Sequence, residues 1–114
     1  MNRFPSIKKN EEFKLIYRSG RSCANDSLIM YVLKQDKNRE NKRIGISASK
    51  KVGNSVVRHR ITRVLRECFR LHRDELKSGY DIVVIARQPA AAMGYEEMSR
   101  AFMNLCSRMG IIAE

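Results

Sequence analysis

The stretch from Ser55 to His72 constrains the fold most, because its pattern predicts one long helix with two opposite faces. On a wheel with about 100° per residue, apolar residues gather on one side and basic residues on the other. The expected buried side consists of Val57, Ile61, Val64, Leu65, Cys68, Leu71 and His72. The basic side consists of His59, Arg60, Arg63, Arg66, Arg70 and Arg73, with Arg58 at its edge. Such a helix packs its apolar side against other elements and leaves the basic side to solvent or a ligand.

Three segments around this helix are predicted to be strands. Residues 27–34 are apolar on both sides, which is typical of a central strand or of one whose second face is kept for a ligand. Residues 43–49 turn Ile44, Ile46 and Ala48 inward, and the outer side is small and polar enough for a ligand to lie on the sheet. Residues 81–87 hold a β-branched run that predicts a buried strand.

Helical patterns at residues 10–19 and 95–109 complete the chain, with Gly20 as a helix stop. Residues 35–41 are polar and predict a loop, and no repeat or linker divides the sequence. One further strand, without defined bounds, is expected between the first helix and residues 43–49. We therefore expect a single α+β domain over residues 1–114, an α-β sandwich with the element order αβββαβα.

The positive charge is concentrated around the long helix. The chain has a net charge of +11, and residues 42–73 contain ten basic residues and one acidic residue, Glu67, or +9 of that total. Charge spread for solubility alone would be more even. Concentrated basic charge without neighbouring acids favours a polyanionic partner.

Several classes of protein are excluded or disfavoured. No apolar run approaches the ~18–20 residues of a membrane span. The first residues lack a secretion signal pattern. Cys23, Cys68 and Cys106 are too few and too widely spaced for a disulfide framework or zinc ribbon. We expect a cytoplasmic protein with no bound metal and no membrane partner.

RNA is the expected partner. A membrane-surface helix would need its apolar side for lipid, whereas this side is needed for the core. A helix-turn-helix for DNA would need a second helix just before residue 55, where a strand and a turn are predicted instead. A sheet with aromatic and small polar residues suits single-stranded RNA. A merely solvated basic face remains the alternative.

The stretch from Arg43 to Arg70 resembles the signature of the bacterial ribonuclease P protein subunit. It reads RIGISASKKVGNSVVRHRITRVLRECFR. Residues 10–20, 31–33 and 80–87 also resemble family positions, in the same order. His59 stands where the family has Asn, and Thr62 stands where it has Lys.

The resemblance implies a fold and two surfaces. The basic helix would join two parallel strands by a left-handed crossover, whereas periodicity alone predicts the common right-handed one. One surface would bind the family's catalytic RNA, and a cleft would receive the single-stranded 5′ leader of precursor tRNA. The RNA-binding residues would be Lys50, Lys51, Asn54, Arg58, His59, Arg60, Arg63, Arg66 and Arg70. The cleft residues would be Phe13, Lys14, Tyr17, Tyr31, Ser47 and Ser49, with Phe13 equally suited to the core.

The resemblance also implies that the RNA, with Mg²⁺, removes the leader and that this chain carries no catalytic residue. A stand-alone nuclease is disfavoured because His59 and His72 lie about 140° apart on the helix and the acids are scattered. A ribosomal or RNA-chaperone protein would fit the charge equally well and remains the alternative.

Overall fold

The computed structural model describes residues 7, 10–35 and 42–113. The predicted element order αβββαβα is confirmed, and all but Gln35 of the loop predicted at residues 35–41 lies outside the described residues. The elements are α1 (Asn10–Ser19), β1 (Arg21–Ala24), β2 (Leu28–Lys34), β3 (Arg43–Ser47), α2 (Ser55–His72), β4 (Tyr80–Ala86) and α3 (Tyr95–Arg108), with short 3₁₀ helices η2 (Arg73–Glu75) and η3 (Gln88–Ala92).

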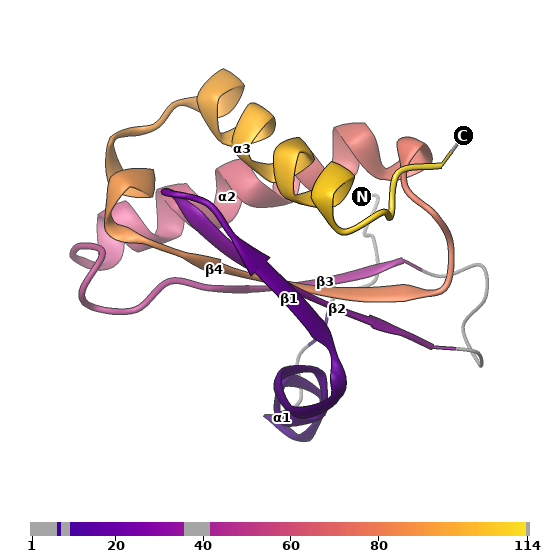
Figure 1. Ribbon diagram of the computed structural model, residues 1–114. Helices are drawn as coiled ribbons and strands as arrows, with labels where there is room; N and C mark the ends of the chain where they lie inside the picture. Colours follow the sequence, from indigo (N-terminus) through magenta and orange to yellow (C-terminus); the bar gives the residue numbers. More distant parts are fainter. Residues whose placement is uncertain (1–6, 8–9, 36–41, 114) are drawn as a thin grey trace, which may run out of the picture.

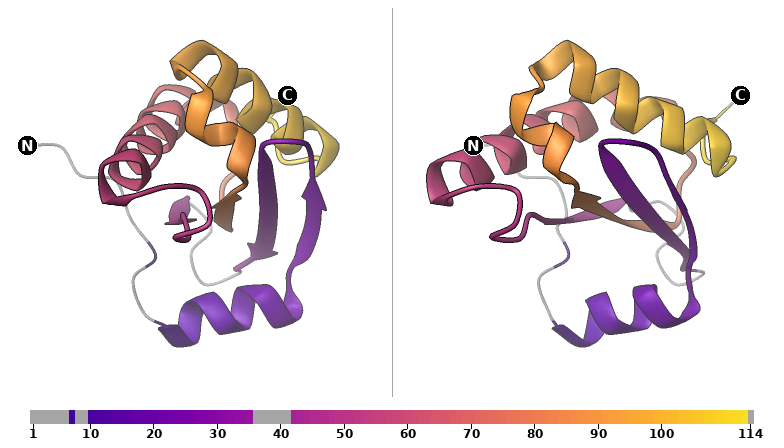
Figure 2. Two further views of the ribbon diagram at one scale, coloured as in Figure 1. Left: turned by 90° about the vertical axis from the view of Figure 1, so that its left-hand side faces the viewer. Right: turned by 60° about the vertical axis from the view of Figure 1, so that its left-hand side comes forward.

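The strands form one sheet in the order β1-β2-β4-β3. β2 pairs antiparallel with β1 and β4, and β3 pairs in parallel with β4. α2 and α3 cover one face of this sheet and α1 lies across the other (Figures 1 and 2). The predicted α-β sandwich is therefore confirmed, with β2 as a central strand.

The connection from β3 through α2 to β4 is left-handed. In the left panel of Figure 2, both strands point toward the reader, α2 lies above them and β4 lies to the right of β3. A connection of the common right-handed type would place β4 on the left. The crossover implied by the resemblance is present, and the one expected from periodicity alone is wrong.

Alternation along the central strands divides the apolar residues into two clusters. Leu28, Met30 and Val32 of β2 belong to the main core beneath α2 and α3. Tyr31 and Leu33 face the other way and pack against a small cluster of Ile7, Ile16 and Val83 beneath α1. The two apolar sides of β2 are thus explained by helices on both faces of the sheet.

Two details of the predicted elements are wrong. Leu71 was expected in the core but is 51% exposed, and Phe69 of the same helix is fully buried instead. The helix is therefore rotated by a fraction of a turn from the expected position, which brings its largest apolar side chain inward. The strand predicted at 43–49 ends at Ser47, because Val52 N–H donates to Ser49 O (3.0 Å) and closes a turn.

No helix among the described residues is long and apolar enough to cross a membrane.

Candidate nucleic-acid interface

The outward side of α2 presents a row of exposed basic residues. We call His59, Arg63, Arg66 and Arg70 the basic face; all four are exposed. The ion pair that this face contains, among the described residues, joins Arg70 Nε to Glu67 Oε1 (2.8 Å). Both side chains are about half exposed, so this ion pair is weak and leaves most of the positive charge of the basic face available to a ligand.

The start of α2 is fixed by its own cap. Asn54 accepts a hydrogen bond from Val57 N–H through Oδ1 (3.0 Å). This cap satisfies one of the helix's unpaired N–H groups. The exposed Lys50 and Lys51 lie in the turn just before it. Asn54 therefore has a structural task beside its predicted RNA contact, and it places the two lysines at the positive end of the helix dipole.

Two of the predicted RNA-binding arginines, Arg58 and Arg60, flank the basic face of α2 and are partly buried. Arg60 Nη1 donates to Met93 O (2.8 Å), and its Nη2 donates to Ala91 O. These bonds join α2 to η3. Arg58 has a buried Nε without a hydrogen-bond partner among the described residues. The structure thus separates these two arginines from the fully exposed basic face.

A shallow hollow of ≈ 350 Å³ lies on the basic face near the start of α2. It is lined by Ser55, Val56, His59 and Arg63. Val56 is 76% exposed, so its apolar side chain is open to a ligand at this hollow. The hollow places an exposed valine side chain beside an imidazole and a guanidinium group.

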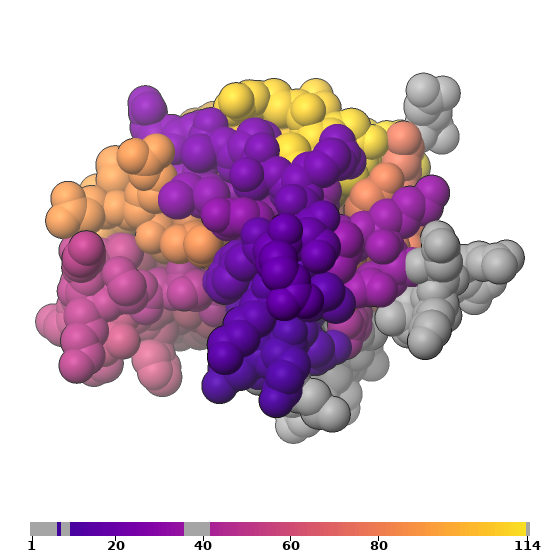
Figure 3. Space-filling model, turned by 60° about the horizontal axis from the view of Figure 1, so that its bottom comes forward, coloured from indigo at the N-terminus to yellow at the C-terminus, as the bar shows by residue number. Residues whose placement is uncertain are grey.

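On the opposite face of the sheet, a groove of ≈ 370 Å³ runs between α1 and β3. Figure 3 shows this side, with α1 in indigo projecting from the sheet. The groove is lined by Asn10, Phe13, Lys14, Tyr17, Ile46 and Ser47. Four of these residues were predicted for the leader cleft, so the structure brings most of that set together.

Three aromatic rings form a connected group at the groove. Phe13 and Tyr17 have ring centroids 6.2 Å apart, and Tyr17 meets Tyr31 edge-on at 5.0 Å. Burial raises the pKa of Tyr17, and the neighbouring Tyr31 raises it further. Tyr17 is therefore protonated at neutral pH and adds no negative charge to the groove.

Phe13 is both a core residue and a groove residue. It packs against the small cluster beneath α1 and also lines the groove. A Cβ at Gly45 would lie 2.7 Å from Phe13 Cζ, so the ring rests directly on the backbone of β3. Glycine at this position is what allows α1 to approach the sheet this closely.

The residues that line the groove differ in part from those predicted for the leader cleft. Tyr31 reaches the groove through Tyr17, whereas Ser49 lies in the turn after β3 and does not line it. Asn10 and Ile46 line the groove although neither was predicted for it, and Ile46 was assigned from the sequence to the inner side of a strand. The signal for Asn10 was its position one turn before Lys14.

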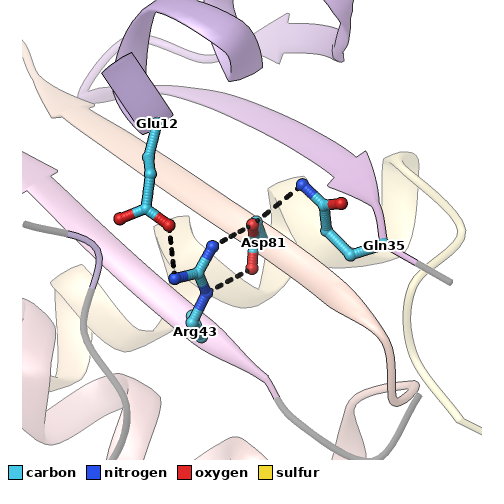
Figure 4. Close-up of polar contacts among 4 residues, drawn as sticks. All are labelled: Glu12, Gln35, Arg43 and Asp81. Atoms are coloured by element: carbon cyan, nitrogen blue, oxygen red, sulfur yellow. Dashed lines mark hydrogen bonds and ion pairs between the residues drawn. The ribbon is translucent and has the colours of Figure 1, made fainter. Parts of the chain in front are cut away.

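Sequence reasoning also missed a network beside the groove (Figure 4). Arg43 binds Asp81 with two hydrogen bonds, from Nε to Oδ1 (2.8 Å) and from Nη2 to Oδ2 (2.6 Å). Its Nη1 donates to Glu12 Oε2 (2.6 Å), and Gln35 Nε2 donates to Asp81 Oδ2 (3.2 Å). The bond to Asp81 is the main reason that the pKa of Arg43 is raised further above its ordinary value. We call these four residues the Arg43 network.

The two histidines have separate surroundings. His59 lies on the basic face, whereas His72 contacts Glu75 Oε2 through Nδ1 (2.6 Å) and Ser99 Oγ through Nε2 (2.8 Å). Among the described residues, no three His, Cys, Asp or Glu side chains gather in a group that could hold a metal ion.

Comparison with known proteins places this chain in a family. The family model for ribonuclease P matches residues 1–110. The ribonuclease P protein component of Clostridium beijerinckii is 44% identical over 110 residues, covering 92% of this chain and 88% of that protein. The Clostridium novyi protein is 42% identical over 111 residues, covering 97% and 98%. The Staphylococcus aureus RNase P protein structure matches with a TM-score of 0.88 at 35% identity, covering 97% of this chain and all of that one. The chain therefore belongs to the ribonuclease P protein family.

Proposed function

We propose that this chain is the protein subunit of a ribonuclease P, and that it assists removal of the 5′ leader from precursor tRNA. Membership of the family supports this activity. The observation that carries the proposal is that one small domain has two unlike surfaces on opposite sides of its sheet. These are the basic face of α2 and the aromatic groove beside α1.

The basic face is the side for the catalytic RNA. Arg63 and Arg66 project from a rigid helix, and a row of guanidinium groups binds phosphates along a folded RNA backbone. Lys50 and Lys51 extend this row beyond the start of the helix. Binding of this kind does not depend on base identity, which suits docking onto the surface of a large RNA.

The groove is the side for the single-stranded leader. Phe13 and Tyr17 offer ring surfaces on which unpaired bases stack, and Lys14 lies beside them to meet a phosphate. Ser47, on the β3 side of the groove, supplies a hydroxyl that can donate or accept a hydrogen bond. A leader bound here is held by shape and stacking, with little sequence preference.

We further propose that the RNA carries out the hydrolysis, with Mg²⁺ as the cofactor of that RNA, and that the complex acts in the cytoplasm. The arrangement of the histidines supports the first part. A pair of histidines that cleaves RNA must converge on one cleft. His72 instead contacts Ser99 of α3 and Glu75, whereas His59 is exposed on the basic face.

Reconstitution of leader cleavage tests the proposal. Precursor tRNA is incubated at low Mg²⁺ with the ribonuclease P RNA of the same organism, with this protein, or with both. We expect cleavage at the mature 5′ end only when both are present. Cleavage by the protein alone, unaffected by removing the RNA, would contradict the assignment of catalysis. An RNA equally active without the protein would contradict the assistance that we propose.

A further inference from the structure

We propose that Arg43 is a positioning residue for the groove: by binding Glu12 of α1 and Asp81 of β4 together, it fixes α1 at the spacing from the sheet that a single RNA strand requires. This inference rests on the proposed function of the groove. Its structural part, the control of α1 by Arg43, can be tested without any RNA.

The pair of Arg43 and Asp81 is a fixed point on the sheet. The two residues are direct partners in the parallel register of β3 and β4. Asp81 is 1% exposed, and two hydrogen bonds from one planar guanidinium hold its carboxylate. A buried carboxylate that lost these bonds would be strongly unfavourable, so the pair stays formed in the folded protein. Gln35 holds the same carboxylate from a second side.

The third nitrogen of Arg43 extends this fixed point to α1. Nη1 binds Glu12, which lies in the first turn of the helix (Figure 4). Among the described residues, α1 otherwise meets the sheet through the apolar side chains of Ile16 and Phe13 and through the edge-on contact of the Tyr17 and Tyr31 rings. Apolar contacts are non-directional and tolerate small rotations and shifts of a helix, whereas a short charged hydrogen bond does not.

The position of Glu12 makes this bond relevant to the groove. Phe13 and Lys14, the next two residues, line the groove, and Tyr17 follows five residues later on the same helix. A rotation of α1 that broke the bond to Glu12 would therefore move all three away from Ser47 on the opposite wall. The walls of the groove, α1 and β3, are the same two elements that the bond connects.

The charges of Glu11 and Glu12 allow a test in which the positioning role and a purely electrostatic effect change RNA affinity in opposite directions. Removing an acidic residue near a polyanion site strengthens binding if charge alone matters. Glu11 and Glu12 are neighbours in the same turn, but Glu11 is exposed while Glu12 binds Arg43. Substitution of either by Ala changes the net charge equally. Only the substitution of Glu12 removes the contact with Arg43.

The experiment compares Glu12→Ala with Glu11→Ala in the reconstituted holoenzyme, measuring affinity for precursor tRNA and for mature tRNA. We expect Glu12→Ala to weaken precursor binding by about three- to ten-fold, the scale of the net contribution of one hydrogen bond, with mature tRNA binding unchanged. Glu11→Ala is expected to leave precursor binding unchanged or slightly stronger. Unchanged or stronger precursor binding with Glu12→Ala would overturn the positioning role, as would an equal loss for both RNAs.

A second measurement on the free protein separates this inference from the function proposed for the groove. Phe13 rests on Gly45, so ¹H NMR cross-relaxation between its ring and the Gly45 α protons reports the position of α1. We expect this signal to weaken in Glu12→Ala and to persist in Glu11→Ala. If it persists in both, Arg43 does not position α1. If wild-type protein gives no preference for precursor over mature tRNA, the groove's proposed function fails while the positioning result still stands.

Arg43→Lys provides an independent variant. Lysine keeps the charge but has one nitrogen, which cannot hold both carboxylates in the fork geometry. We expect the same selective loss of precursor binding as for Glu12→Ala. Should this variant fail to fold because Asp81 is buried, Glu12→Ala still decides the matter, since it leaves the bonds between Arg43 and Asp81 in place.

Discussion

The basic face of α2 and the groove beside α1 differ in how their side chains are held. Arg63 and Arg66 are exposed and have no ion-pair partner among the described residues, so their charge acts over several ångströms and tolerates small movements. Phe13 and Tyr17 are in ring contact and depend on where α1 lies. The first surface is expected to weaken gradually as charges are removed. The second is expected to fail when one ring or one link is lost.

Loss of a groove ring gives the largest expected effect on binding. Tyr17→Ala removes the ring that contacts both Phe13 and Tyr31. One base–aromatic stack is worth about 1–3 kcal/mol, so precursor affinity should fall between about five-fold and more than a hundred-fold. Binding assays with precursor and mature tRNA check this, with Tyr17→Phe as the control that keeps the ring. Equal losses for both RNAs would place the leader elsewhere.

Arg60 tests whether every arginine of α2 belongs to the exposed surface. Its bonds to the carbonyls of Ala91 and Met93 predict that Arg60→Ala lowers the free energy of unfolding by about 1–3 kcal/mol, because two acceptors lose a charged donor. Urea denaturation measures this. The salt dependence of RNA binding should change less than in Arg66→Ala. If Arg60→Ala changed the salt dependence of RNA binding as much as Arg66→Ala and left the stability unaltered, Arg60 would act as a residue of the basic face.

The apolar layers beneath the two surfaces differ in their cysteine content. The core under α2 and α3 contains Cys68 and Cys106, and burial raises their thiol pKa values to about 11 and about 12. Among the described residues, the cluster under α1 contains no cysteine.

These raised pKa values predict a loss of stability at alkaline pH. Unfolded thiols release their protons above about pH 9 while the folded ones retain them, so stability is complete below pH 9 and falls above it. We expect about 1 kcal/mol per cysteine between about pH 9 and pH 10. Denaturation at both pH values, with a Cys68→Ala/Cys106→Ala protein as control, checks this. An unchanged pH dependence in the control would exclude the thiols as the cause.

Single arginines of the basic face give the smallest expected effect. Arg66→Ala should reduce the slope of log affinity against log salt by about 0.7–0.9 and weaken RNA binding only a few-fold. Titrations at several salt concentrations measure the slope. Arg100→Ala, an exposed arginine of α3, serves as the control with the same loss of charge. Equal slopes for both variants would mean that the basic residues of α2 contribute no more to RNA binding than an arginine elsewhere on the surface.

The sequence predicted the elements better than the contacts between them. Periodicity placed α2 at its observed bounds, because an 18-residue amphipathic pattern is long enough to be unambiguous. It misplaced Leu71 and Phe69, because the centre of the buried side depends on how the sheet and α3 meet the helix. It also left the short β1 without bounds, since four residues carry little pattern.

The groove and its network show what local patterns omit. Phe13, Lys14 and Tyr17 were placed beside Ser47 only through a resemblance to a family, and their contact with RNA is still a prediction. Arg43 was counted only as one of the ten basic residues between positions 42 and 73, yet it binds two carboxylates within the protein. Its partner Asp81 is 38 residues away, and their contact follows only from the parallel register of β3 and β4.

The parallel pairing of β3 with β4, which are separated in sequence by α2, has a consequence for synthesis on the ribosome. Among the described strands, β3 pairs only with β4, which is made after the whole of α2. Until residue 86 has left the ribosome, the arginine-rich helix has no complete sheet to cover its apolar side. Such non-local pairing also forms slowly. The nascent chain therefore carries strong positive charge and exposed apolar surface together, close to ribosomal RNA, before the sheet that forms one wall of the groove is complete.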